Sequence, residues 1–127
     1  MTEHGTIWWS ELATRDPEKA KAFYGQTIGW RFSGMPSPDG TTYYMANVGD
    51  NPVAGIFTMK GEQFAGVPEH WMTYITVDNV DQRAKAVAAA GGQVIREPFD
   101  IPGVGRIAIV KDSGGAVVGL GTPAAGR

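Results

Sequence analysis

Hydrophobic and polar residues alternate over short stretches in the first half of the chain, with one helical stretch among them. Residues 6–13 (TIWWSELA) mix aromatic and β-branched residues with polar ones, which is typical of a strand. Asp16 followed by Pro17 signals a helix start and predicts a helix over residues 18–24. Further strands are predicted over residues 30–33, 41–48 and 53–59. The predicted order is one strand, one helix and three strands.

The second half of the chain repeats this order. Residues 70–77 (HWMTYITV) predict a strand, and Asn79 can cap a helix over residues 80–90. Gly91-Gly92 ends that helix in the way a left-handed C-terminal cap does. Further strands are predicted over residues 93–96, 106–111 and 116–120.

The two halves align with each other, which indicates an internal repeat. Asp16 falls on Asn79, 63 positions further on, and residues 53–56 (VAGI) fall on residues 117–120 (VVGL), 64 positions further on. We therefore predict a single domain over residues 1–127 made of two modules. Module one covers about residues 6–59, the linker residues 60–69, and module two about residues 70–122.

Composition and charge exclude several classes of function. Eleven basic and 13 acidic residues give a net charge of -2, so nucleic acid is not expected as a partner. The chain has no cysteine, which excludes disulfides, thiolate metal sites and cysteine nucleophiles. Apolar runs such as residues 107–110 are far shorter than the ~20 residues of a membrane helix. Together with a polar, acidic start, this leads us to expect a cytoplasmic protein without membrane contact.

Each predicted sheet has one face without a helix. One helix per module covers one face of about four strands and leaves the other uncovered. Four Trp, four Tyr and five Phe supply a large aromatic surface for a chain of 127 residues. A small-molecule ligand can occupy such a face, and a partner subunit can cover it instead.

Several short motifs carry a resemblance to a known superfamily. In the first half they are Glu11-Leu-Ala-Thr-Arg-Asp16, Ala20-x-x-Phe23-Tyr24 and Gly29-Trp30. In the second half they are Val77-Asp78-Asn79, Gly91-Gly92-x-Val94, Arg96-Glu97-Pro98 and Asp112-x-x-Gly115. With this order and duplication, the chain resembles the vicinal oxygen chelate superfamily. That superfamily includes glyoxalase I, extradiol dioxygenases and the bleomycin-resistance proteins.

The resemblance implies an α+β fold in which two tandem βαβββ modules form a half-open barrel around a cavity. It also implies a homodimer. Metal-dependent members place four His, Glu or Gln ligands, one in the first and one in the last strand of each module. The matching positions in this chain hold Trp9, Gly55, Met72 and Gly119. None of these side chains offers the nitrogen or carboxylate donor that such metals bind, so we expect no metal and no other cofactor.

Strand alternation selects residues for the ligand-facing surface. If Trp9 faces the cavity, Glu11 faces it too, and His70, Met72 and Tyr74 do so in module two. The register of the third strand is open, so either Tyr43 or Tyr44 can point inward. The predicted ligand-binding residues are Trp9, Tyr43, Asn47, Phe57, Met59 and Met72.

Three of these inward positions carry groups that could take part in catalysis. Glu11 on an apolar wall could act as a base or anchor a cationic ligand, or could accept structural hydrogen bonds instead. His70 could transfer protons or could sit at the rim of the site. Tyr74 could donate to a ligand oxygen or could only pack its ring.

These observations lead to a preferred function and to alternatives. The preferred hypothesis is a metal-free protein of the glyoxalase/bleomycin-resistance type that binds a planar or aromatic small molecule. The first alternative is a metal-free isomerase, cyclase or hydroxylase-like enzyme that uses Glu11 with His70 or Tyr74. The second is a metal-dependent lyase or dioxygenase. Fold-level analogy does not decide among them.

Overall fold

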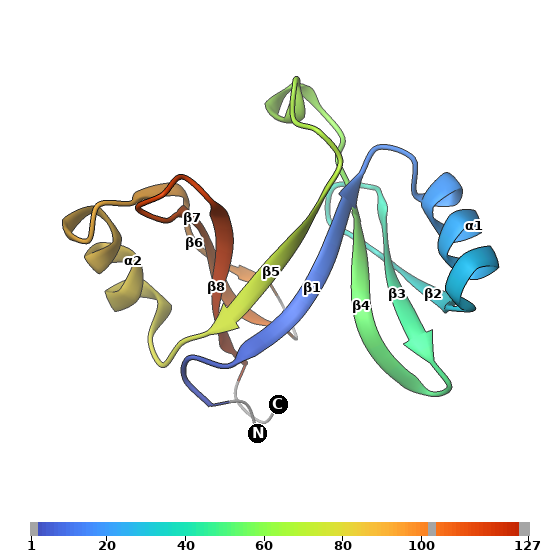
Figure 1. Ribbon diagram of the computed structural model, residues 1–127, viewed down its shortest axis with the longest axis horizontal. Coiled ribbons are helices and arrows are strands. Elements are labelled where there is room, and N and C mark those ends of the chain that lie inside the picture. Colours follow the sequence, from blue (N-terminus) through green and yellow to red (C-terminus); the bar gives the residue numbers. More distant parts are fainter. Residues whose placement is uncertain (1–2, 102–103, 125–127) are drawn as a thin grey trace. The chain divides into compact units, whose positions relative to one another are not determined.

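The computed structural model describes residues 3–101 and 104–124, which form an α+β fold of two βαβββ modules (Figure 1). By packing, the described residues divide into two compact units. One comprises residues 9–71, and the other comprises residues 3–8 together with 72–124. The predicted order of elements is confirmed in both modules. The arrangement of the modules around a shared cavity stays a prediction.

Module one contains a four-stranded sheet and one helix. Its strands follow the order β2-β3-β4-β1, in which β1 is parallel to β4 and the other neighbours are antiparallel. The elements are β1 (Ile7–Thr14), α1 (Pro17–Ile28), β2 (Arg31–Pro36), β3 (Thr42–Val48) and β4 (Asn51–Thr58).

Module two repeats this topology. Its strands follow the order β5-β8-β7-β6, in which β5 is parallel to β8 and the other neighbours are antiparallel. The elements are β5 (His70–Thr76), α2 (Val80–Ala89), β6 (Gln93–Ile101), β7 (Gly105–Lys111) and β8 (Val117–Pro123). Neither helix, nor any other helix among the described residues, is long and apolar enough to cross a membrane.

The predicted helix caps are present. The Asp16 side chain accepts a hydrogen bond from the backbone N–H of Lys19 at 3.1 Å, and the Asn79 side chain accepts one from Gln82 at 3.1 Å. Each bond satisfies one of the backbone donors that a helix start leaves without a partner. Helix α1 continues through Gly25 and ends at Gly29, whose φ of 78° is left-handed.

Strand β6 is longer than the sequence pattern predicted. The sequence pattern predicted a strand over residues 93–96, yet the strand runs to Ile101. The pairing with β7 shifts register twice, between Val94 and Arg96 and between Arg96 and Phe99. The second shift contains Pro98, and β6 is the last strand in its sheet. Proline is tolerated at such edge and bulge positions because no ladder hydrogen bond is lost there.

The segment between the modules is attached to module one. It contains the 3-10 helix η1 (Glu62–Phe64). The Glu69 carboxylate accepts hydrogen bonds from the Thr14 hydroxyl and, at 2.7 Å, from the Arg15 backbone N–H. The Arg15 guanidinium in turn donates to the Phe64 carbonyl oxygen at 2.7 Å. These bonds join the middle of the segment, at Phe64, and its end, at Glu69, to the end of β1.

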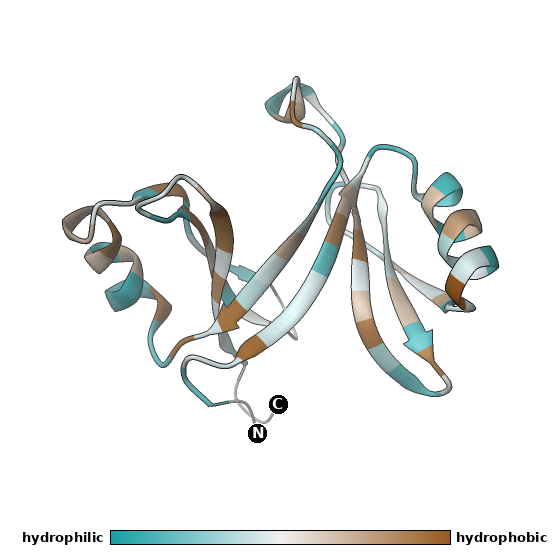
Figure 2. Ribbon diagram, viewed as in Figure 1, coloured by the Kyte–Doolittle hydropathy of each residue, from teal (hydrophilic) through white to brown (hydrophobic). Residues whose placement is uncertain are grey.

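The two helices cover their sheets to different extents. In module two, Val80 of α2 packs with Val77 and Ala108 in a buried cluster. The partly buried Leu120 side chain packs against this cluster. Helix α1 has no buried residue. Coloured by hydropathy, β4 is hydrophilic at its start and then alternates between hydrophobic and near-neutral stretches (Figure 2). The buried residues of this sheet include Ile56 and Ala54 of β4.

Candidate ligand-binding site

The two adjacent tyrosines of β3 face opposite sides of the sheet in module one. The Tyr44 hydroxyl donates to Glu18 of α1 at 3.1 Å, and the Lys21 ammonium lies 3.8 Å from the centre of its ring. Tyr44 therefore faces the helix. Because neighbouring side chains in a strand alternate, Tyr43 points to the face that α1 does not cover. The structure thus shows that Tyr43, and not Tyr44, lies on the face of this sheet that α1 leaves uncovered.

On the uncovered face, three polar side chains form a chain of hydrogen bonds. The Trp9 indole Nε1–H donates to the Tyr43 hydroxyl oxygen at 3.0 Å. The Tyr43 hydroxyl donates to Glu11 Oε2 at 2.9 Å. Trp9 and Glu11 are two positions apart on β1 and so share one face. We call these three residues the polar triad.

The polar triad depends on a glycine beneath it. Gly55 of β4 is the partner of Glu11 in the parallel pairing of β1 with β4. A Cβ atom at position 55 would overlap the Tyr43 hydroxyl. The absence of a side chain at Gly55 is therefore what allows the Tyr43 ring to cross β4 and reach Glu11.

The environment keeps the Tyr43 hydroxyl protonated. Burial raises the pKa of this phenol well above its usual range, and the negative charge of Glu11 raises it further. The hydrogen bond from Trp9 acts in the opposite direction because it favours the phenolate. The net result is a neutral phenol that donates to Glu11 throughout the physiological pH range.

Apolar side chains surround the polar triad on this face. Met35 of β2 pairs with Tyr43, and Met45 of β3 pairs with Gly55, so both lie on the triad's side of the sheet. Met35 is 49% exposed. Phe57, which pairs with Ala13 on β1, packs its ring against Phe64 with the ring centres 5.6 Å apart. The face is therefore mainly apolar around three hydrogen-bonded polar groups.

Module two carries a tyrosine over a glycine at the matching position. Tyr74 of β5 pairs with Gly119 of β8, as Glu11 pairs with Gly55 in module one. A Cβ atom at position 119 would overlap the Tyr74 ring. Tyr74 is buried, which favours the packing role over the catalytic one. Met72, two residues earlier on β5, is half-buried.

The remaining predicted residues lie at other positions. Asn47 donates to the Ser33 hydroxyl at 3.2 Å, next to a register shift between Ala46 and Asn47. Met59 is buried just after β4, and its N–H donates to the Thr14 carbonyl oxygen at 2.8 Å. His70 Nδ1 lies 2.8 Å from the Pro68 carbonyl oxygen. The structure thus brings Trp9, Glu11 and Tyr43 together, while catalysis by Glu11, His70 or Tyr74 stays a prediction.

Sequence reasoning did not foresee the role of the two glycines. Gly55 and Gly119 were identified only as positions without a metal donor. The sequence did indicate that the two glycines occupy equivalent positions, since Gly55 and Gly119 are related by the 64-position offset of the repeat. What it could not show is which side chain fills the space above each glycine.

The residues at the superfamily's ligand positions do not fit a metal. Trp9 and Met72 offer no nitrogen or carboxylate donor, and at the two glycine positions a tyrosine fills the space that a ligand side chain would need. Among residues 3–101 and 104–124, no three His, Cys, Asp or Glu side chains lie close enough together to hold a metal ion.

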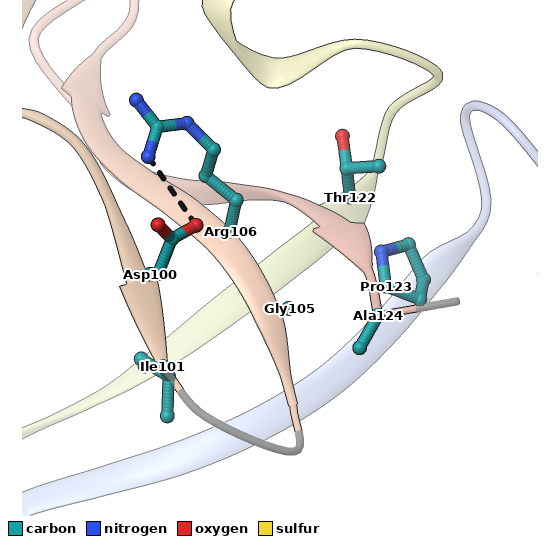
Figure 3. A pocket seen from close by; sticks show the side chains of 7 residues that line it. All are labelled: Asp100, Ile101, Gly105, Arg106, Thr122, Pro123 and Ala124. Carbon is teal, nitrogen blue, oxygen red and sulfur yellow. Dashed lines mark ion pairs between the residues drawn. The ribbon is translucent and has the colours of Figure 1, made fainter. Parts of the chain in front are cut away.

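A shallow hollow of about 320 Å³ lies in module two, away from the predicted site residues. Its lining includes Arg106 and Asp100, which form an ion pair at 3.3 Å (Figure 3). Arg106 also makes two hydrogen bonds to Asp81 of α2, at 2.9 and 3.0 Å. Since its guanidinium is occupied by these two carboxylates, we assign Arg106 a structural role that joins α2 to β7.

Comparison with known families agrees with this fold. The family model described as Glyoxalase/Bleomycin resistance protein/Dioxygenase superfamily matches residues 6–120. The chain belongs to this superfamily, and the resemblance noted in the sequence motifs is confirmed.

Curated relatives include proteins from Mycobacterium and Streptomyces. "Putative glyoxylase CFP32" of Mycobacterium bovis is 43% identical over 124 residues, which cover 98% of this chain and 46% of that protein. The anthracycline biosynthesis protein DnrV of Streptomyces peucetius is 29% identical over 123 residues, covering 88% of this chain and 45% of DnrV. The chain thus spans about half the length of the curated relatives it matches.

Solved structures share the fold at low sequence identity. The hypothetical protein BH1468 of Bacillus halodurans superposes with a TM-score of 0.73 at 14% identity, covering 98% of this chain and 99% of that one. Methylmalonyl-CoA epimerase of Streptomyces coelicolor superposes with a TM-score of 0.68 at 20% identity, covering 97% and 100%. At such identities the likeness establishes the fold and not the activity.

Proposed function

We propose that this chain binds a small planar or aromatic organic molecule, without a metal, on the face of module one that α1 leaves uncovered. The observation that carries the proposal is the polar triad of Trp9, Tyr43 and Glu11 on a mainly apolar surface. Small-molecule sites in proteins have this composition, with apolar and aromatic walls and a few polar groups that fix the orientation of the ligand.

The surroundings of the triad suit a flat ligand. Trp9 is half-buried, and Met35 and Val53 are exposed at 49% and 41%. An aromatic ligand placed here would remove this apolar surface from water and could stack on the Trp9 ring.

A named relative supports the same class of ligand. DnrV carries the description of an anthracycline biosynthesis protein and shares 29% of its aligned residues with this chain. Anthracyclines are planar polycyclic aromatic compounds, which fits the mainly apolar surface around the triad.

Intrinsic tryptophan fluorescence tests the proposal. We expect a panel of planar aromatic compounds to contain members that quench the protein's fluorescence in a saturable way. The substitution Trp9→Phe should remove most of the saturable signal. The matched substitution Trp71→Phe should retain it, because the Trp71 indole lies beside Tyr24 of α1, to which it donates at 3.1 Å. Absence of saturable quenching across the whole panel would overturn the proposal.

A further inference from the structure

In both modules, a side chain from another segment binds the backbone N–H of the residue that precedes the helix cap. In module one that residue is Arg15, whose N–H donates to Glu69 Oε2 at 2.7 Å. In module two it is Asp78, whose N–H donates to His4 Nδ1 at 2.9 Å. Arg15 and Asp78 are related by the 63-position offset of the repeat. The two modules therefore fix the same helix position with two different side chains.

The two side chains respond differently to pH. Hydrogen bonds from the Thr14 hydroxyl and the Arg15 N–H lower the pKa of the Glu69 carboxyl below its ordinary value, so Glu69 stays an acceptor at physiological pH. Histidine is the side chain that ordinarily changes its charge between about pH 5 and pH 8. A ring nitrogen accepts a hydrogen bond only while it carries no proton. Acidification therefore removes the kind of bond found in module two and spares the one in module one.

The geometry indicates which ring nitrogen of His4 carries the proton in the neutral form. Because Nδ1 accepts from the Asp78 N–H, the proton of the neutral ring belongs on Nε2. A second proton can enter only at Nδ1, where it would meet the hydrogen of that N–H. The Asp78 carboxylate lies close by, with Oδ1 3.5 Å from Nδ1. A protonated His4 would therefore exchange its backbone bond for an ion pair with this carboxylate.

His4 belongs to a short segment, residues 3–6, that pairs with β5. Gly5 donates its N–H to the Thr76 carbonyl oxygen at 2.7 Å, and Thr76 donates its N–H to the Thr6 carbonyl oxygen at 2.8 Å. We call residues 3–6 the N-terminal segment. It lies in the same compact unit as β5 and α2. Two backbone bonds thus join this segment to β5, and the His4 bond joins it to the start of α2.

The charged groups around His4 come from the start of α2 and from its own segment. Asp78 is the carboxylate beside the ring, and Arg83 of α2 donates two hydrogen bonds to that carboxylate, at 2.8 and 2.9 Å. Glu3 is the neighbour of His4 in the N-terminal segment, and Thr76, its partner on β5, is uncharged. Because Arg83 already binds the Asp78 carboxylate, an ion pair with His4 replaces the lost backbone bond only in part.

From this we infer that His4 attaches the N-terminal segment to the start of α2 in a pH-dependent way: the neutral ring holds the segment, and the protonated ring loosens it. The inference concerns module two alone and is independent of the ligand proposed for module one. The corresponding bond of module one, from Arg15 to Glu69, is the internal control.

The first test is the position of the proton on each of the two histidines, read from long-range ¹H–¹⁵N NMR spectra of the imidazole rings at about pH 8. His4 should carry its proton on Nε2. His70 should carry it on Nδ1, because that atom lies 2.8 Å from the Pro68 carbonyl oxygen, which can only accept. The variant His70→Asn assigns the two sets of signals. A proton on Nδ1 of neutral His4 would overturn the inference.

Amide hydrogen exchange then measures the loosening. Protection of the Asp78 and Gly5 amides, corrected for the intrinsic effect of pH on exchange, should fall about two- to tenfold from pH 8 to pH 5, since one neutral hydrogen bond contributes about that much. The Arg15 amide should keep its protection. Unchanged protection of Asp78, a fall that leaves Gly5 unaffected, or an equal fall at Arg15 would each overturn the inference.

Substitutions at position 4 separate the bond from its titration. In His4→Asn, the amide oxygen can accept from the Asp78 N–H but does not titrate, so protection of Asp78 should no longer depend on pH. His4→Ala has no acceptor, and its Asp78 amide should be less protected than that of the wild type already at pH 8. His70→Asn is the matched control and should keep the wild-type pH dependence. Circular dichroism checks that each variant is folded. A pH dependence that persists in His4→Asn would overturn the assignment to His4, and the wild-type measurements need none of these variants.

Discussion

At the scale of single residues, Gly55 decides what the face of module one can present. Its partner in the sheet is Glu11, and the Tyr43 hydroxyl occupies the space that a side chain at position 55 would fill. A larger residue would displace the phenol from both Trp9 and Glu11. Position 55 needs glycine because the Tyr43 ring approaches the backbone closely there. The backbone conformation does not require glycine, since the φ of Gly55 is not positive.

This close approach predicts the effect of adding one methyl group. Gly55→Ala should lower the free energy of unfolding by about 1–3 kcal/mol, because it separates buried hydrogen-bonding groups, and should also weaken ligand binding. Gly25→Ala, in α1, is the matched control. A Cβ there would meet only the Trp30 carbonyl oxygen at 3.7 Å, and alanine favours the helix. It should raise stability by about 0.5–1 kcal/mol. Chemical denaturation measures both, and equal stability of the two variants would contradict this account.

The residue scale is also where prediction from sequence was least complete. Strand alternation placed Trp9 and Glu11 on one face, and in the structure both make a hydrogen bond with Tyr43, which the sequence did not predict. The choice between Tyr43 and Tyr44 could not be made, because two adjacent aromatic residues fit either register. The bonds of Tyr44 to α1 are tertiary contacts that no local pattern encodes.

At the scale of elements, the start of α2 is held by a group of charges. The Asp78 carboxylate accepts two hydrogen bonds from the Arg83 guanidinium, at 2.8 and 2.9 Å. His4 Nδ1 accepts a bond from the Asp78 backbone N–H at 2.9 Å. The Arg83 bonds, with smaller contributions from the Asn79 backbone N–H and His4, lower the pKa of Asp78 to about 2.

The lowered pKa of Asp78 predicts a dependence of stability on pH. An unfolded aspartate has a pKa of about 3.9, so the ionised pair contributes fully above that pH. As the pH falls from about 4 to about 2, the folded protein must take up this proton, and the contribution is lost. Thermal unfolding over this range should therefore show a smaller pH dependence for Asp78→Asn than for the wild type. Parallel loss of stability in both proteins would argue against the pair.

Most elements could be predicted because their signals are local. Asp16 and Asn79 cap the two helices as expected, since capping depends on a side chain and a backbone N–H three residues away. The extent of β6 could not be predicted in the same way. Its passage through Pro98 depends on two register shifts against β7, and these are properties of the pair of strands.

At the scale of the whole molecule, the question is what else the chain contacts. Its curated relatives are about twice as long, so a chain of 127 residues matches only part of each. Within module one, Phe23 and Ile28 of α1 are each 57% exposed. The corresponding helix α2 instead buries Val80 and Ala84. Large apolar side chains on an exposed helix favour association.

We propose that two copies of this chain associate through α1. Sedimentation velocity at micromolar concentration should then give the mass of a dimer. Phe23→Ser should shift the equilibrium toward the monomer, whereas Lys85→Ser, at an exposed position of α2, should not. A monomer for the wild-type protein at this concentration would refute the proposal.

Ligand binding at the polar triad is the central claim, and the indole signals of the four tryptophans in a ¹H–¹⁵N NMR spectrum test it most directly. Trp→Phe substitutions assign the signals, and the protein is then titrated with 2-naphthol. Because the Trp9 indole N–H belongs to the triad, its signal should shift in a saturable way, together with the backbone amide of Gly55. The Trp71 indole, which donates to Tyr24, should shift little. Saturable shifts confined to Trp30 and Trp71, with Trp9 and Gly55 unmoved, would contradict the account.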